Sequence, residues 1–163
     1  MRSKQEVAEI YSRNSQMIYR ICYMFMKNAH DAEDMTHNTF VKLMNSVVGF
    51  ESEEHEKAWL IRTASNTCKD SLKSAWAKRV EIPDTLAYHE NAVDDTLEQV
   101  LALPEKYKIP IYLFYYEGYK TAEIAKMLGK PEVTIRGIMH RGRKLLKLEL
   151  ENNYGQERIN SGV

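Results

Sequence analysis

The chain has 163 residues, of which 44% are hydrophobic and 28% charged, and its formal net charge is zero. These proportions favour one ordinary globular domain or two small ones, and they exclude a collagen-like or wholly disordered chain. No apolar run reaches the roughly 18 residues that span a bilayer, and the first residues are polar rather than signal-like. We therefore expect a cytoplasmic protein that does not insert into membranes. Cys22 and Cys68 lie within apolar helical patterns, which indicates buried thiols.

The charge is unevenly distributed. Residues 1–79 carry 12 Lys and Arg against 10 Asp and Glu, and residues 97–150 carry 10 against 6. Residues 80–96 carry five acids and no base. Two mildly basic blocks thus flank an acidic joint. A DNA phosphate responds to the local field of each block, so the zero total does not exclude nucleic-acid binding.

Apolar residues in the first block recur at the spacing of an α-helix, and no period-two alternation competes with it. Asp31 and Asp34 are typical of a helix start, and Gly49 is expected to end a helix. The block is therefore predicted to be a bundle of three or four helices. The apolar sets are Ile18, Ile21, Cys22 and Phe25; Phe40, Leu43, Met44 and Val47; and Ile61, Ser65, Cys68 and Leu72.

The remainder of the chain is also predicted to be helical after a linker. A helix is expected from about Asp95 to Leu103, Pro110 at the first turn of the next helix, and Gly118 at its end. The last residues are polar and are expected to be frayed. The prediction is thus an all-α protein of two small helical domains, divided as 1–79, an acidic linker 80–95, a C-terminal domain 96–150 and a polar tail 151–163.

Residues 119–147 have the pattern of a helix-turn-helix. Thr121 is a suitable N-cap, Gly129 permits the tight turn, and Pro131 suits the first turn of the second helix. The inward side of the first helix is predicted from Ile124, Ala125 and Leu128. Ala125 is small enough for a second helix to cross closely.

The second helix separates into an apolar and a basic face at about 100° per residue. The apolar stripe contains Ile135, Met139, Gly142 and Leu146. The basic ridge contains Arg136, His140, Arg143 and Lys147, extended by Lys144 and Arg141, and no acid interrupts it. An ordinary solvated face would mix Glu with Lys to gain ion pairs. The pattern instead predicts a recognition helix, with Arg donors for guanine edges and basic side chains for phosphates.

The sequence resembles the extracytoplasmic-function group of bacterial sigma factors. The C-terminal resemblance lies in Leu103–Tyr107, Tyr115–Tyr119, Glu123–Ala125, Leu128–Gly129 and Thr134–Arg143. The N-terminal resemblance lies in Asp31–Asp34 with Thr39-Phe40, and in Ala58–Arg62 through Asn66 to Asp70. The resemblance implies a specificity subunit of RNA polymerase without catalytic residues, whose N-terminal domain captures the minus-ten element and whose C-terminal domain reads the minus-thirty-five element. The acidic linker would thread through the polymerase between them.

The resemblance also implies partners and residue roles. The partners are both large subunits of core RNA polymerase and promoter DNA, with an anti-sigma protein plausible. Contacts to the minus-thirty-five element are expected from Thr121, Thr134, Arg136, Gly137, His140, Arg141, Arg143, Lys144 and Lys147. Contacts to the minus-ten element are expected from Trp59, Arg62 and Asn66, although core packing is an alternative role for Trp59. Core polymerase binding is expected from Asp31, Glu33, Asp34, Thr39 and Phe40.

Other functions have less support. The cysteines and histidines show no ligand-pair spacing, so no metal and no cofactor are expected. No phosphate loop or nucleophile elbow suggests an enzyme. A stand-alone helix-turn-helix regulator, which binds DNA without polymerase, is the main alternative, and a sigma-like protein that has lost promoter opening is another. The acidic loop Glu51–Glu56 either points away from melted DNA or discriminates among bases.

Overall fold

The computed structural model describes residues 2–78 and 95–160. These residues form seven α-helices and contain no strand, which confirms the all-α prediction. The chain divides into two compact units, Met1–Val93 and Asp94–Val163. The acidic linker predicted at 80–95 lies outside the described residues apart from Asp95, which is the first residue of a helix. No helix in the described parts is both long and apolar enough to cross a bilayer.

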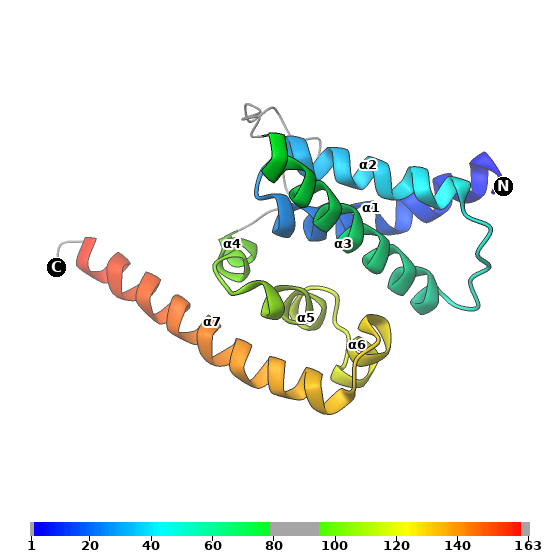
Figure 1. Ribbon diagram of the computed structural model, residues 1–163. Helices are drawn as coiled ribbons and strands as arrows, with labels where there is room; N and C mark the ends of the chain where they lie inside the picture. Colours follow the sequence, from blue (N-terminus) through cyan, green and yellow to red (C-terminus); the bar gives the residue numbers. More distant parts are fainter. Residues whose placement is uncertain (1, 79–94, 161–163) are drawn as a thin grey trace. The chain divides into compact units, whose positions relative to one another are not determined.

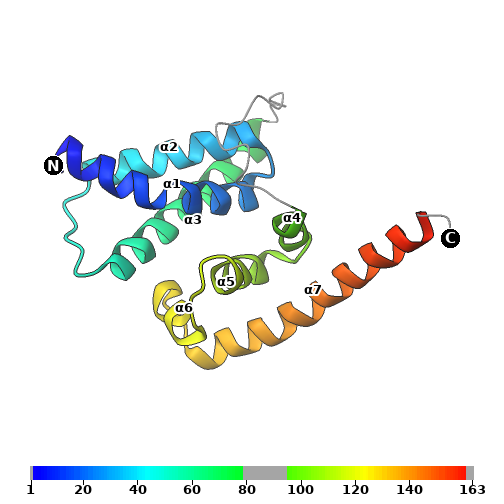
Figure 2. The same cartoon turned by 180° about the vertical axis from the view of Figure 1, so that it is seen from behind.

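The first unit is a three-helix bundle of α1 (Lys4–Met26), α2 (Ala29–Asn45) and α3 (Glu53–Lys78). Helices α1 and α2 lie side by side, and α3 packs against both (Figures 1 and 2). Short polar side chains cap the helix starts. Ser3 Oγ accepts the Glu6 N–H at 3.1 Å, and Asn28 Oδ1 accepts the Asp31 N–H at 2.8 Å.

The core of this bundle agrees with most of the predicted apolar spacing. Its side chains come from all three helices and include Ile18, Ile21, Cys22, Phe25, Phe40, Leu43, Leu60, Ile61 and Cys68. The predicted set is wrong at Met44 and Val47, which are 42% and 90% exposed. Helix α2 ends at Asn45, so Val47 lies in the following loop and is not carried on the helix face. The expected stop at Gly49 therefore comes four residues too late.

The second unit contains α4 (Asp95–Leu101), α5 (Glu105–Tyr115), α6 (Thr121–Leu128) and α7 (Glu132–Asn160). Figure 1 shows α6 meeting the start of α7 at a sharp turn, with α5 packed against both. The core side chains are contributed by every helix and include Leu97, Val100, Leu103, Tyr107, Ile111, Tyr112, Leu113, Ile124, Met127, Ile135, Ile138 and Met139.

Two predictions for this unit are wrong. Pro110 lies inside α5 and not at its first turn, because the helix already begins at Glu105 after Pro104. The ring removes one backbone donor, while Ile111 and Leu113, in the following turn, are fully buried and hold the helix in the core. The end of the chain is not frayed over residues 151–160, because α7 continues to Asn160. Residues 145–151 are all Leu, Lys or Glu, which are strong helix formers.

Candidate nucleic-acid interface

The turn between α6 and α7 confirms the helix-turn-helix and fixes how the two helices meet. Gly129 has φ +65°, a left-handed conformation that glycine adopts without a steric penalty. The next residue closes the turn, because the Lys130 N–H donates to the Ala125 carbonyl at 2.9 Å. At the other end of α6 the Glu123 carboxylate accepts the Lys120 N–H at 3.1 Å. The N-cap is therefore Lys120, and the prediction of Thr121 is wrong by one position.

Helix α7 has one buried and one exposed face over residues 132–147. Ile135, Ile138 and Met139 are buried, as is Gly142. Gly142 allows α7 to pass close to α5, since a Cβ at this position would lie 3.0 Å from Ile111 Cδ1. The buried face contacts α5 and α6, so the basic side chains face solvent.

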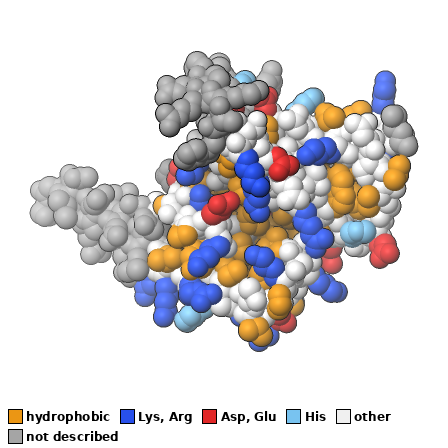
Figure 3. Space-filling view, viewed as in Figure 1, with side chains coloured by type: hydrophobic (Ala, Val, Ile, Leu, Met, Phe, Trp, Pro, Cys, Tyr) orange, Lys and Arg blue, Asp and Glu red, His pale blue; other side chains and the backbone are white. Residues whose placement is uncertain are grey.

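The structure brings most of the predicted minus-thirty-five residues together on this solvent face. The exposed ones are Thr134, Arg136, His140, Arg141, Arg143, Lys144 and Lys147, whereas Thr121 and Gly137 are half-buried. Figure 3 shows Lys and Arg side chains gathered along α7 in the C-terminal unit. A cationic face on the second helix of a helix-turn-helix is suited to a DNA major groove.

The three arginines on this face make different contacts. Arg136 Nη2 pairs with Glu132 at 2.7 Å. Glu132 lies one helical turn before Arg136, outside the acid-free residues 136–147. The Arg143 guanidinium lies over the Phe114 ring, 4.8 Å from its centroid. Arg141 has no ion pair among the described residues and lies against Gly137. Arg141 is therefore the arginine of this face with the greatest freedom to reach a base.

The first unit brings the predicted minus-ten residues onto one side of α3. Trp59, Arg62 and Asn66 follow at intervals of three and four residues, which places them on one helix face. Arg62 and Asn66 are exposed, and Trp59 is half-buried. The Phe50 ring meets Trp59 edge-on at 5.9 Å between centroids. Trp59 therefore packs against Phe50 while part of its side chain stays exposed.

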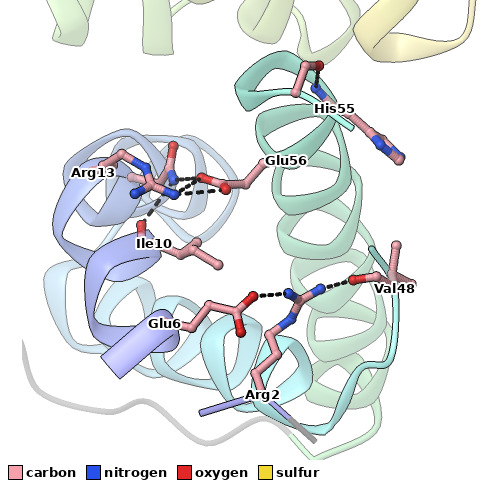
Figure 4. Close-up of polar contacts among 9 residues, drawn as sticks. Arg2, Glu6, Ile10, Arg13, Val48, His55 and Glu56 are labelled. Atoms are coloured by element: carbon pink, nitrogen blue, oxygen red, sulfur yellow. Dashed lines mark hydrogen bonds and ion pairs between the residues drawn. The ribbon is translucent and has the colours of Figure 1, made fainter. Parts of the chain in front are cut away.

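An aromatic cluster before α3 was missed by the sequence reasoning. Phe50 also meets the His55 ring edge-on at 5.5 Å, and the Arg2 guanidinium lies 4.6 Å from the Phe50 centroid. Arg2 donates to the Val48 carbonyl and pairs with Glu6 at 2.7 Å (Figure 4). The available signal was the aromatic residue directly before the acidic loop. These contacts hold the loop between α2 and α3 against α1.

The prediction of a loop at Glu51–Glu56 is wrong for its last four residues, because α3 begins at Glu53. One carboxylate of this acidic segment is internal. Glu56 is buried, and Arg13 Nη2 donates to its two oxygens at 3.1 and 2.9 Å (Figure 4). Asn14 Nδ2 donates to Glu56 Oε1 at 2.9 Å. Hydrogen bonding to Glu56 raises the pKa of Arg13 above its ordinary value. Of the four acids in this segment, Glu51, Glu53 and Glu54 are exposed, and only Glu56 points into the bundle.

Of the residues predicted to bind core polymerase, three reach the surface and two are buried. Asp34 is exposed, and Asp31 and Glu33 are half-buried, near the start of α2. Thr39 is fully buried and donates from Oγ1 to the Met35 carbonyl at 2.7 Å, and Phe40 is 5% exposed. The structure assigns Thr39 and Phe40 to the packing of α2, so in this conformation they are not available for a direct surface contact.

A small group of possible metal ligands also lies at the start of α2, where the sequence gave no ligand-pair spacing. The ligand atoms of His30, Asp31 and Asp34 lie within 4.8 Å of one another. His30 Nε2 is 3.8 Å from Asp34 Oδ2, and the Asn28 amide donates to Asp31 Oδ2 at 2.8 Å. Acidic residues stabilise the amide end of a helix without any ion, and that role accounts for this group.

Comparison with protein families identifies the two units. A family model for sigma-70 region 2 matches residues 10–78, and a model for sigma-70 region 4 matches residues 94–146. The chain belongs to the sigma-70 family. It is a member of the extracytoplasmic-function group, because the curated relatives are factors of that group.

Two relatives illustrate the similarity to this sigma factor. The chain is 29% identical over 153 residues to the ECF RNA polymerase sigma factor SigE of Mycolicibacterium smegmatis, a match that covers 85% of the chain and 59% of SigE. It is 27% identical over 168 residues to SigW of Bacillus subtilis, which covers 90% of the chain and 88% of SigW. The chain thus spans less than two thirds of SigE and most of SigW.

Solved structures support the fold of the sigma factor. The sigma factor RpoE, crystallised with the anti-sigma factor NepR from Bartonella quintana, superposes with a TM-score of 0.63 at 18% identity and covers 91% of the chain and 96% of RpoE. CnrH, in complex with the cytosolic domain of CnrY, superposes with a TM-score of 0.66 at 18% identity, and 92% and 90% of the two chains are covered. In family terms, α1–α3 form region 2 and α4–α7 form region 4.

Proposed function

We propose that this sigma factor binds core RNA polymerase, directs it to specific promoters and assists DNA opening. The exposed basic face of α7 carries the proposal, because it belongs to a helix-turn-helix in a chain that also contains region 2. A stand-alone regulator would need the helix-turn-helix but would have no need of region 2. The domain boundaries 1–79 and 96–150 are part of this proposal, and so is passage of residues 80–95 through the polymerase.

Within region 4 the roles follow from exposure and pairing. Arg141 is assigned to a base edge, where a bidentate contact with guanine is worth about 1–3 kcal/mol of discrimination. Arg143 and Lys144 are assigned to phosphates, and Arg136 contributes once Glu132 releases it. His140, Lys147 and Thr134 complete the groove-facing surface. Thr121 reaches a phosphate from the start of α6, and at Gly137 the backbone makes the close approach.

Within region 2 the exposed side of α3 is assigned to the minus-ten element. Asn66 and Arg62 contact melted DNA, and Trp59 supports a base flipped from the stack. Unstacking a base costs a few kcal/mol, which a pocket and the polymerase interface must offset. Asp31, Glu33 and Asp34 form the polar part of the contact with core polymerase. Thr39 and Phe40 act through the packing that holds α2 in place.

The sigma factor performs no chemical step of its own in this proposal, because the polymerase carries the catalysis. Work with RNA polymerase also requires a cytoplasmic location. A partner anti-sigma protein is proposed by analogy with RpoE, a structural relative that was crystallised with the anti-sigma factor NepR. Such a partner would cover the surfaces that polymerase needs and so hold the factor inactive.

The deciding experiment is transcription in vitro from a random promoter library, with holoenzyme reconstituted from core polymerase and the purified chain. We expect co-purification with core polymerase and enrichment of start sites that share two upstream elements. Arg141→Ala should relax one position of the distal element, and Asn66→Ala should weaken the proximal element. Lys106→Ala, which removes an exposed charge from α5, is the matched control and should leave both elements unchanged. Tight binding to an operator without polymerase would favour the stand-alone regulator.

A further inference from the structure

One apolar side chain stands out on the face of α7 that the proposed function places in a groove. Val133 is the second residue of the helix and is 77% exposed. Thr134 and Arg136 are the next exposed residues along the helix, and His140, Arg141 and Lys144 follow about two to three turns later; all of them are polar or basic. Apolar residues scattered singly over a surface are ordinary and need no ligand. The position of Val133, in the first turn of a recognition helix, gives it a specific use.

Val133 heads a row of residues spaced by four. Val133, Gly137 and Arg141 follow one another with an offset of about 40° at each step, so they lie along one line of the helix surface. Gly137 contributes no side chain to this line. Arg141 Nη2 lies 3.4 Å from the place where a Cβ of Gly137 would stand, and no other side chain outside the neighbouring residues comes as close.

The gap at Gly137 leaves the two ends of the row accessible. Arg141 is exposed and has no ion pair in the described part of the chain, so its guanidinium can move away from Gly137 at the cost of a van der Waals contact. Once it has moved, the helix surface between Val133 and Arg141 carries no side chain of this row. A long polar residue at 137 would cover this stretch. With glycine there, a base edge can approach the backbone closely.

Thymine is the base that fits this arrangement. Its C5-methyl is the apolar group that base pairs present in the major groove, and it is recognised by apolar contact. Guanine presents the two acceptors that an arginine binds in a bidentate manner. We propose that Val133 reads the methyl group of one thymine in the minus-thirty-five element, while Arg141 reads a guanine nearby. This inference rests on the proposed function, because it requires α7 to enter that element.

The test replaces single thymines by deoxyuridine, which removes only the methyl group. The preferred distal element is first selected with wild-type holoenzyme, and each thymine in it is then substituted in turn. Binding of holoenzyme is measured by competition at fixed salt, because phosphate contacts make affinity depend on salt. We expect one substitution to weaken wild-type binding about three- to fivefold, the effect of one buried methyl group. The same substitution should change binding by the Val133→Ser holoenzyme by less than about 1.5-fold.

Two further variants separate recognition from general damage. Val133→Ile keeps an apolar side chain and should retain the loss on deoxyuridine substitution. Lys144→Ala removes a phosphate contact and should weaken binding to the thymine and deoxyuridine promoters equally. A thermal melt of each variant establishes that region 4 is folded.

The outcomes distinguish this inference from the proposed function. If holoenzyme selects a distal element but no deoxyuridine substitution affects wild type more than Val133→Ser, the role of Val133 is overturned and the sigma function stands. The same holds if the selected element contains no thymine. If holoenzyme selects no distal element, both the inference and the proposed function are overturned.

Discussion

The buried carboxylate of Glu56 provides the most direct test of how region 2 is held together. Glu56→Ala removes a side chain that is 8% exposed and bonded to α1 by Arg13 and Asn14. Glu56→Gln keeps its shape and loses its charge. Both substitutions lie at the start of α3, so they probe the contact that fixes this end of the helix against α1.

The expected loss of stability follows from the partners that remain. A hydrogen bond to a charged group contributes about 1.5–3 kcal/mol, and a buried polar group left without its partner costs about 1–3 kcal/mol. Arg13 is 43% exposed, so water replaces much of its share. Asn14 is fully buried and keeps one donor bond, to the Ile10 carbonyl at 3.0 Å. We expect Glu56→Ala to lower the free energy of unfolding by about 2–3 kcal/mol and Glu56→Gln by about 1 kcal/mol.

Urea denaturation followed by tryptophan fluorescence measures this loss in the full chain. Both tryptophans, Trp59 and Trp76, lie in α3, so the signal reports on region 2. At an m value of about 1–2 kcal/mol/M, the midpoint for Glu56→Ala should fall by about 1–3 M. Glu54→Ala, at an exposed position of the same turn, is the matched control and should leave the midpoint unchanged. Equal midpoints for the Glu56→Ala and Glu54→Ala proteins would refute the reasoning.

Three further predictions concern other parts of the molecule. Glu132→Gln releases Arg136 and should tighten holoenzyme binding to a promoter about two- to fivefold at low salt. The gain should be smaller at high salt, where ion pairs are screened. An unchanged Kd would contradict this prediction. Gly129→Ala forces a Cβ into the left-handed region and should cost region 4 about 1 kcal/mol, seen as a lower melting temperature. A hydrogen bond with Cys22 and burial raise the pKa of Cys68, so the thiol stays protonated at pH 8. Cys22 and Cys68 are both buried, so both should react with Ellman's reagent only on unfolding, and rapid labelling of the native protein would disprove their burial.

The recognition helix shows which features are readable from sequence. The apolar stripe, the basic ridge and the turn at Gly129 all depend on residues within one or two helical turns, so a local pattern carries them. The ion pair between Glu132 and Arg136 was equally local, at a spacing of four residues. Glu132 lies one helical turn before residues 136–147, which contain no acid. A longer window would have found it.

Glu56 shows what a local pattern does not carry. In the sequence it is one of four acids within six residues, and nothing nearby distinguishes it from Glu53 or Glu54. Its partners are 42 and 43 residues away on α1, so its burial depends on how the helices pack. The four acids of this segment therefore do not all face the same way. Glu51, Glu53 and Glu54 are exposed, while Glu56 anchors the start of α3 to α1.

Whether a residue is buried or exposed also decides which substitutions can test polymerase binding. Resemblance identifies a helix by its whole motif, and that motif mixes surface residues with core residues. Phe40 packs edge-on against Tyr11 at 4.8 Å between centroids, so Phe40→Ala would create a cavity and destabilise α2 by about 3–5 kcal/mol. Loss of polymerase binding in that variant would follow from unfolding alone. Asp34→Asn leaves the core intact, so a weaker interaction with core polymerase in that variant would report on the contact itself.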